Sequence, residues 1–366
     1  MKINVAKNLK RLRKERNITQ EKLAEFIGVS FQAVSKWERD EGYPDITLLP
    51  VLANFFGVTT DELIGMNEIK DKQKLDEILQ IWEENRTAGN IRKCIDICRE
   101  GLKSFPNDFR LMMNLSDSLG FLDEIDQEMR KKNLEEAIEI DKRILEHCTD
   151  NEIRNYVQTN LCYHYSWNGN NQKAIEEAEK LPYLFQTVES TVPCFKSGEE
   201  RTKSAQSAIM SFTEALRLAI IALADVNYLH DQPWTVEERI KMLDKTNEVY
   251  RIIYDDGDYH FINGYLSESY RLMAALSLLI NKTEDALLYL EQAAEFAIAK
   301  DDLPPKIKHT SLLVNTLEYN INLTSKNYTC NESAILLEKL QQERYDIFRN
   351  DERFIRIVNR LKEVAK

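Results

Sequence analysis

The sequence predicts an all-α fold in two parts, a five-helix domain over residues 1–66 and a helical-repeat domain over residues 67–366. Apolar residues recur at three- and four-residue spacing along the chain, which indicates amphipathic helices. Helix-breaking residues are few, with 11 Gly and 8 Pro among 366 residues. No run of alternating polar and apolar residues bounded by turn residues indicates a strand.

Composition and charge favour a folded, cytoplasmic protein. Hydrophobic residues make up 43% of the chain, well above the level of disordered proteins, and no uninterrupted apolar run is long enough to suggest a membrane span. The net charge of −12 is uneven, because residues 1–66 carry +1 and residues 67–366 carry −13. Seven basic residues and one acidic residue lie in the first 16 positions, where such a cluster can meet phosphate.

Six cysteines are scattered at irregular spacings, and we expect reduced thiols buried in the core. They are Cys94, Cys98, Cys148, Cys162, Cys194 and Cys330. Cys94 and Cys98 lie four residues apart and would share a helix face, as two metal ligands do, but no second ligand pair accompanies them. The sequence therefore predicts no metal and no cofactor.

The first two helices are predicted from apolar residues that recur on one face of each. These residues are Ile3, Ala6, Leu9 and Leu12 in the first helix and Leu23, Ala24 and Ile27 in the second. Asn17 ends the first helix, and Thr19 is the expected N-cap of the second. Gly28 ends the second helix, because glycine takes the left-handed conformation at little cost.

A short turn, residues 28–30, leads into a third helix from Phe31 to about Arg39, with Ser30 as its N-cap. Val34 and Trp37 form its inward face. The residues expected to point outward are Phe31, Gln32, Ser35 and Lys36. Pro44 prevents the helical segment from continuing. Two further helices are predicted over residues 46–56 and 60–64.

These motifs resemble the lambda-repressor and Cro type of helix-turn-helix, the XRE family. The matching segments are residues 19–24 (TQEKLA), 28–30 (GVS), 34–38 (VSKWE), 44–45 (PD), 52–53 (LA) and 56–63 (FGVTTDEL). The resemblance covers about 62 residues, so it extends over the whole five-helix domain.

The resemblance implies that the third helix enters the major groove and that the second crosses the DNA backbone. The DNA-binding residues carried over by position are Gln20, Ser30, Phe31, Gln32, Ser35, Lys36, Arg39 and Tyr43. Gln32 would pair with adenine, Lys36 would reach guanine, and Phe31 would touch a thymine methyl group. Gln20 is the expected phosphate contact, and Arg13 and Glu38 correspond to the family's structural ion pair.

The loop after the third helix departs from this pattern. Asp40 and Glu41 lie where similar proteins often carry basic or neutral residues near phosphate, and two carboxylates there should reduce affinity for DNA. The alternative interpretation is a helical bundle that has lost DNA binding and serves as a dimerisation or docking module.

The long second part contains amphipathic segments that begin with a small residue. They lie at residues 93–95, 136–138, 173–175, 285–287 and 333–335, and the first three are 43 and 37 residues apart. They resemble the second helices of tetratricopeptide repeats, most clearly over residues 156–181. The resemblance implies an α-solenoid with a concave inner surface, and the alternative is an unrelated helical bundle.

The sequence gives little support for catalysis, and we expect no enzyme activity. The histidines are dispersed along the chain, at His147, His164, His230, His260 and His309. No glycine loop for phosphate and no nucleophile motif is present. Residues 255–258 (DDGD) lack the spaced ligands and the closing Glu of a calcium loop, which favours a solvated turn between helices.

An XRE domain followed by tetratricopeptide-like repeats resembles the Gram-positive regulators that sense short secreted peptides. The resemblance implies double-stranded DNA as a partner and a homodimer. It also implies a peptide or other effector bound in the solenoid, which changes the dimer geometry that is most populated.

Asn160, Asn227 and Asn263 could hold a peptide backbone, although a solvent-facing position is favoured for each. The remaining alternatives are a protein-interaction adaptor that the DNA-binding domain merely localises, and a constitutive dimer that binds no ligand.

Overall fold

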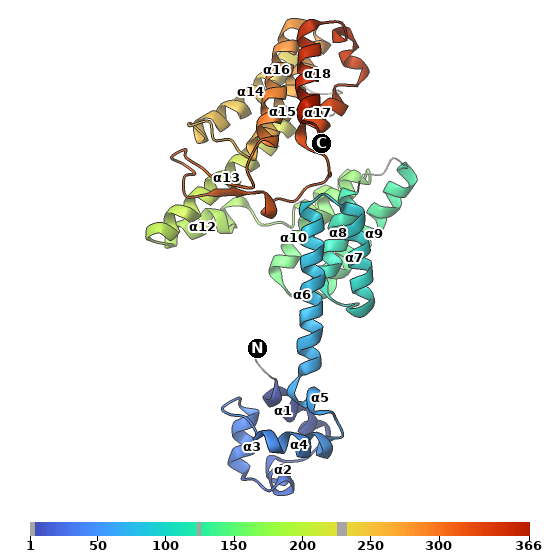
Figure 1. The fold of residues 1–366 in the computed structure, drawn as a ribbon, viewed down its shortest axis with the longest axis vertical. Helices are drawn as coiled ribbons and strands as arrows, with labels where there is room; N and C mark the ends of the chain where they lie inside the picture. The colour runs from blue at the N-terminus through green and yellow to red at the C-terminus, as the bar shows by residue number, and fades with distance from the viewer. Residues whose placement is uncertain (1–3, 123–125, 225–232) are drawn as a thin grey trace. The chain divides into compact units, whose positions relative to one another are not determined.

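The computed structural model describes residues 4–122, 126–224 and 233–366 (Figure 1). Contacts divide the chain into two units. The first unit comprises Met1–Glu83 with Ile97–Leu111, and the second comprises Glu84–Asp96 with Met112–Lys366. Residue 66, where the sequence predicts the end of the first domain, is the first residue of helix α6 (Met66–Thr87), and this domain boundary stays a prediction.

The helix-turn-helix domain within the first unit has the five α-helices that the sequence predicts, shown in blue in Figure 1. They are α1 (Val5–Glu15), α2 (Gln20–Ile27), α3 (Phe31–Glu38), α4 (Leu49–Phe56) and α5 (Thr60–Ile64). The predicted fourth helix begins as a separate 3₁₀ turn, η1 (Ile46–Leu48). Leu9, Leu23, Val34, Leu52 and Leu63 are fully buried in one core.

The rest of the described chain is also mainly helical, which confirms the all-α prediction. Its longer helices are α7 (Ile91–Ser104), α8 (Phe109–Phe121), α9 (Gln127–His147), α10 (Asn151–Trp167), α13 (Gly198–Ala224), α14 (Val236–Ile253), α15 (Ile262–Leu279), α16 (Thr283–Asp301) and α18 (Glu352–Val364). The shorter helices are α11 (Asn171–Ala178), η2 (Leu184–Gln186), α12 (Val188–Phe195), η3 (Ile321–Leu323), α17 (Glu332–Lys339) and η4 (Glu343–Phe348).

Small residues set the closest helix packing in the second unit. Helix α15 packs along α16. Helix α15 also contacts α14, and α16 also contacts α17 and α18 (Figure 1). Ala274, Ala286, Ala293, Ala294 and Ala297 are fully buried in this core. Their short side chains let the helices approach closely, as expected where helical hairpins stack.

The expectation that everything after residue 66 is helical is wrong for residues 302–331, which we call the strap. It contains a small antiparallel sheet of β1 (Lys306–Lys308) and β2 (Glu318–Asn320), with Ile307 opposite Tyr319. Pro304 and Pro305 lie just before β1, and proline cannot continue a helix without losing a hydrogen bond. The sequence signal for these three-residue strands is too short to recognise.

Helix α13 contains a long apolar segment, but Glu214 and Arg217 interrupt it, so the expectation of no uninterrupted apolar run of membrane-spanning length holds here. An 18-residue window of this 27-residue helix has a mean hydropathy of 1.6, so the helix is long and apolar enough to cross a membrane by length and composition. Its polar residues instead bind within the second unit: Glu214 accepts a hydrogen bond from Tyr250 of α14 at 2.6 Å and pairs with Arg217. These contacts attach α13 to α14.

The cysteines follow the core prediction only in part. None of the six forms a disulfide bond, and Cys94, Cys98 and Cys148 are buried. Cys162 and Cys330 are half-buried, and Cys194 is exposed, so the expectation of a core thiol is wrong at Cys194. Its position at the end of the short helix α12 leaves its side chain outside the core.

Candidate nucleic-acid interface and internal pocket

Local signals in the sequence position the helix expected to read DNA. Thr19 caps α2 by accepting a hydrogen bond from the backbone N–H of Lys22 at 3.2 Å. Gly28 ends α2 with φ = 73°, a left-handed conformation that most side chains disfavour. Ser30 then caps α3 by accepting from Ala33 at 3.2 Å.

Helix α3 has one buried and one exposed face. Val34 and Trp37 are buried in the domain core, as the spacing predicts. Of the residues expected to read bases, Phe31, Gln32 and Lys36 are exposed and Ser35 is half-buried. Ser30 and Tyr43 are exposed as well, so these side chains are available to a ligand.

The structure joins Arg13, Glu38 and Gln20 in one polar network. Arg13 donates to both carboxylate oxygens of Glu38 at 2.5 and 2.9 Å, and also to the carbonyl of Ile18 at 2.7 Å. Burial disfavours the charged form of Glu38, but hydrogen bonds from Arg13 and Gln20 outweigh it and lower its pKa. This network links α1, α2 and α3.

The side chain of Gln20 donates its amide to Glu38 at 2.7 Å, a contact that sequence reasoning missed. A phosphate contact from this residue stays a prediction and now depends on its place at the first turn of α2. A wide, shallow concavity there is lined by Arg13, Lys14, Thr19 and Gln20 among others. Backbone N–H groups at a helix N-terminus and nearby cations favour an anion.

The loop after α3, which we call the acidic loop because it carries Asp40 and Glu41, forms an ion pair with one predicted DNA contact, Arg39. Arg39 donates to both carboxylate oxygens of Glu41 at 2.8 and 2.7 Å, and to the hydroxyl of Ser35 at 2.9 Å. Asp40 has φ = 62°, which turns the chain so that Glu41 lies beside Arg39. The guanidinium is therefore engaged by a carboxylate while it is free of DNA.

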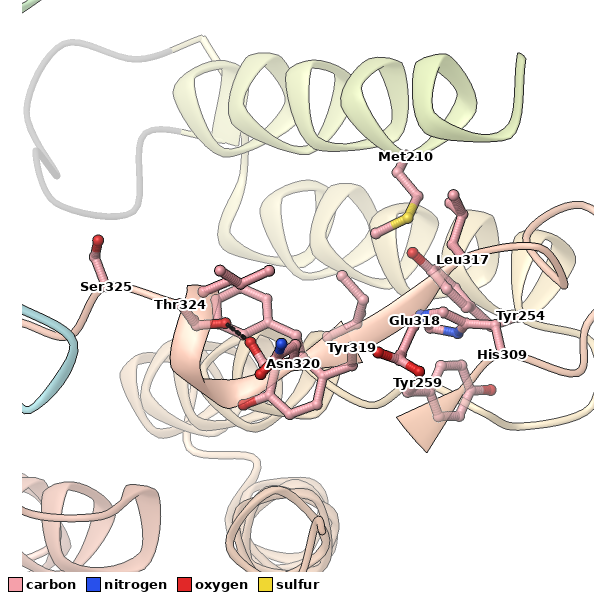
Figure 2. A pocket seen from close by; sticks show the side chains of 13 residues that line it. Met210, Tyr254, Tyr259, His309, Leu317, Glu318, Tyr319, Asn320, Thr324 and Ser325 are labelled. Carbon is pink, nitrogen blue, oxygen red and sulfur yellow. Dashed lines mark hydrogen bonds between the residues drawn. The ribbon is translucent and has the colours of Figure 1, made fainter. Parts of the chain in front are cut away.

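The second unit contains a partly open pocket, which we call the aromatic pocket (Figure 2). Its volume is about 420 Å³. Residues of α13, the turn between α14 and α15, and the strap line it: Met210, Tyr254, Tyr259, Phe261, Ile262, His309, Leu317, Glu318, Tyr319, Asn320, Leu323, Thr324 and Ser325. A mostly apolar lining with a few polar groups is typical of ligand sites.

Lys300 lies behind the pocket wall and was not anticipated from the sequence. Its ammonium group is 4.2 Å from the ring centroid of Phe261 and 4.4 Å from that of Tyr319. It also hydrogen-bonds the Tyr319 hydroxyl at 3.1 Å. Burial lowers the pKa of Lys300 to about 8, so its charge is sensitive to changes in these surroundings.

The asparagines considered for peptide binding do not converge on this pocket. Asn160 is half-buried and Asn263 is buried, so the solvent-facing position favoured for Asn263 is wrong. Both lie outside the pocket lining, and Asn227 lies outside the described residues. The internal position of Asn263 follows from its place in the first turn of α15, which packs on several neighbours.

A second polar cluster is sealed inside the second unit. Asp141 of α9 accepts hydrogen bonds from Ser116 of α8 at 2.5 Å and His164 of α10 at 2.8 Å. Serine and histidine both bind the carboxylate here, whereas a nucleophilic triad needs serine to contact histidine. We interpret the cluster as a structural link between three helices.

The turn at residues 255–258 is only partly solvated, so the expectation for it is wrong at Asp258. The Asp258 carboxylate is buried and accepts hydrogen bonds from the backbone N–H groups of Thr310 at 2.7 Å and Ser311 at 3.2 Å. The Ser311 hydroxyl donates to it as well. Because these partners lie about fifty residues away along the chain, the local sequence carried no signal of them.

Comparison with known proteins identifies the class of the N-terminal domain. A family model described as "Helix-turn-helix" matches residues 9–63. Residues 9–63 therefore form a helix-turn-helix domain.

Two curated relatives resemble this part of the chain. The "HTH-type transcriptional activator BcrR" of Enterococcus faecalis is 48% identical over 61 residues, which is 17% of this chain and 30% of that protein. The "HTH-type transcriptional regulator ImmR" of Bacillus subtilis is 34% identical over 74 residues, 20% of this chain and 58% of that protein. The chain thus spans about a third to just over a half of these relatives.

Solved structures align with most of the chain. One of them is Bacillus thuringiensis PlcR in complex with the peptide PapR7 and DNA, at 16% identity. The alignment covers 81% of this chain and 94% of PlcR, with a TM-score of 0.32.

Proposed function

We propose that the protein is a sequence-specific DNA-binding regulator of transcription that acts in the cytoplasm. The observation that carries the proposal is the exposed face of α3, where Phe31, Gln32 and Lys36 lie on a helix fixed by caps and a buried core. Packing does not require these side chains, whereas base recognition does. The relatives named above are called transcriptional regulators, which favours this role over that of an adaptor.

The proposal includes an effector that binds the second unit and alters DNA binding. The aromatic pocket supports this, because its volume of about 420 Å³ lies within the usual range of ligand cavities. Its wall of tyrosine, phenylalanine and aliphatic side chains suits an apolar side chain of a short peptide, and Glu318 and Asn320 are polar residues of the same lining. An effector shifts a protein between conformations only as far as it prefers one of them.

A homodimer is part of the same proposal. The segment around α12 and α13 exposes large apolar side chains, with Phe185 at 87% and Phe195 at 83% exposure. Tyr183, Val188 and Leu218 are exposed in the same segment. Apolar surface of this kind marks interfaces in soluble proteins, and helix-turn-helix dimers bind two DNA half-sites.

Binding to DNA upstream of the protein's own gene tests the central claim. The full-length protein is titrated into labelled fragments at two salt concentrations, with Gln32→Ala plus Lys36→Ala as the test variant. A charge-matched control, Gln172→Ala plus Lys103→Ala, removes exposed residues far along the chain. We expect salt-sensitive, sequence-selective binding that only the test variant loses. Equal binding by both variants, or none by the wild type, contradicts the proposal.

A further inference from the structure

Three metal-ligating side chains from two distant segments meet beside the aromatic pocket. Asp258 and His260 lie in the turn between α14 and α15, and His309 lies in the strap just after β1. Their candidate ligand atoms all lie within 4.8 Å of one another. All three residues are buried, and His309 also lines the pocket (Figure 2).

Hydrogen bonds fix which nitrogen of each imidazole carries the proton. His260 Nε2 lies 3.1 Å from the carbonyl oxygen of Lys308, and His309 Nδ1 lies 3.1 Å from both the carbonyl and the carboxylate of Asp258. Because these oxygens only accept, the nitrogens that face them must donate. In the neutral rings, Nδ1 of His260 and Nε2 of His309 therefore keep a free lone pair.

Neither of these two nitrogens has a hydrogen-bond partner among the residues that the structure describes. The ring centroids of His260 and His309 are 4.3 Å apart, so an ion bound at the usual 2.0–2.1 Å from a nitrogen of each ring would lie between these two side chains.

The surroundings of both rings match those of metal-binding histidines. Such histidines donate their second ring N–H to a carboxylate or a backbone carbonyl, which fixes the ring and strengthens the ligand. Asp258 provides this partner for His309, and its carboxylate is held by Thr310 and Ser311. Lys308 provides it for His260, which is itself held in a left-handed conformation with φ = 47°.

We propose that His260 and His309 bind a divalent transition-metal ion through Nδ1 and Nε2 respectively, with the Asp258 carboxylate orienting His309. Imidazole ligands suit zinc, copper, nickel and iron ions, and the nearby carboxylate offsets part of the positive charge. The ion would join the turn between α14 and α15 to the strap. Its remaining coordination positions belong to water or to a ligand in the pocket, so the inference deepens the proposed effector site.

Zinc binding by the full-length protein provides the test. Protein carrying Cys194→Ser, which removes the exposed thiol, is freed of metal with a chelator and then titrated with Zn²⁺ by calorimetry. We expect saturation at one ion per chain and a rise in Tm, because an ion that binds only the folded state stabilises it. His260→Gln and His309→Gln should each weaken binding at least tenfold.

The control is His147→Gln, because this imidazole is 57% exposed and far along the chain from the proposed ligands. It should leave Zn²⁺ binding unchanged. Binding that survives both His260→Gln and His309→Gln, or the absence of saturable binding, overturns the proposal and leaves the two rings as a packing contact.

A spectroscopic measurement tests the same ligands without a histidine substitution, so it does not depend on whether the variants fold. Cu²⁺ bound to the Cys194→Ser protein, with both histidines intact, should show electron paramagnetic resonance hyperfine structure from two imidazole nitrogens. A spectrum of thiolate or purely oxygen ligation overturns the assignment. Neither measurement uses DNA or peptide, so failure here leaves the regulator proposal standing, and loss of DNA binding leaves this one standing.

Discussion

The two units differ in whether their buried polar groups have hydrogen-bond partners within the protein. In the first unit, Glu38 is surrounded by donors, with Arg13 and Gln20 occupying its carboxylate. In the second unit, six buried side-chain atoms of the described residues have no partner within the protein. They are Arg239 Nε, Thr246 Oγ1, Asn247 Oδ1, Ser269 Oγ, Ser333 Oγ and Tyr345 OH.

The difference indicates where each unit can change shape. A satisfied network has little to gain from rearrangement, so the first unit is suited to presenting α3 in one geometry. Buried polar atoms without a protein partner gain free energy from water or from a shifted helix. Several of them lie on α14 and α15, whose connecting turn also contributes to the aromatic pocket.

Removing Glu38 tests the first half of this comparison and has the largest expected effect. Glu38→Ala leaves the guanidinium of Arg13 without its carboxylate, and breaking a buried pair costs about 3 kcal/mol. Hydrogen exchange measured by mass spectrometry should show faster exchange in α1–α5. Arg11→Ala, which breaks an exposed pair with Glu15, is the control and should change exchange little. Equal effects of the two variants would mean that the network does not rigidify the domain.

Acid titration sharpens the same point. The pKa of Glu38 is lower in the folded protein than in the unfolded chain, so the unfolded state binds the proton more readily. The stabilisation is therefore complete above the unfolded pKa of about 4.3 and is lost as pH falls through the folded value. In Glu38→Gln, the stability of α1–α5 between about pH 5 and pH 3 should depend less on pH than in the wild type.

Steric addition tests the packing of the second unit. A Cβ atom at Gly120 of α8 would clash with the imidazole of His164, and overpacking of a core costs about 1–3 kcal/mol. We expect Gly120→Ala to lower Tm and to accelerate exchange in α8–α10. Gly42→Ala is the control, because a Cβ atom there meets open space. An unchanged Tm in Gly120→Ala would show that the Asp141 cluster adapts easily.

Alkaline titration reports on the region behind the aromatic pocket. The pKa of Lys300 is about 8 in the folded protein, below its value of about 10.4 in an unfolded chain. Between these values the unfolded state binds more protons, so the contribution of Lys300 to stability rises with pH. Lys300→Met should remove this rise, as measured by Tm from pH 7.5 to pH 9.5. The exposed Lys103→Met serves as the control and should retain it.

The same contrast explains what the sequence could predict. In the first domain several helices carry local start and stop signals, such as the caps Thr19 and Ser30 and the left-handed Gly28, which a pattern of a few residues reveals. The positions of the five helices and of the α3 side chains followed from them. The role of Gln20 beside Glu38 did not, because an amide fits either a phosphate or a carboxylate.

The pocket and the histidine pair depend on contacts between distant segments. His260 and His309 lie 49 residues apart in the sequence, and the strap that carries His309 follows no helical or strand period. The DDGD motif indicated a turn but not that Asp258 faces inward. Such convergence is set by how α13, α14 and the strap pack together, which a local pattern does not encode.

The smallest expected effect concerns the acidic loop and returns to DNA binding. Glu41 holds the Arg39 guanidinium in a two-oxygen ion pair, so DNA must compete with this carboxylate for the same group. Glu41→Gln should release Arg39, raise DNA affinity a few-fold and steepen the salt dependence by up to about one phosphate contact.

The matched control is Glu25→Gln, which changes the charge equally on α2 at an exposed position. If both variants raise affinity to the same extent, the gain comes from net charge alone and Arg39 is not a phosphate contact. A gain confined to Glu41→Gln, absent when Arg39 is also replaced by alanine, would assign the effect to the released guanidinium. The acidic loop would then limit the affinity of a rigid DNA-binding domain for DNA. Larger conformational changes would take place in the second unit.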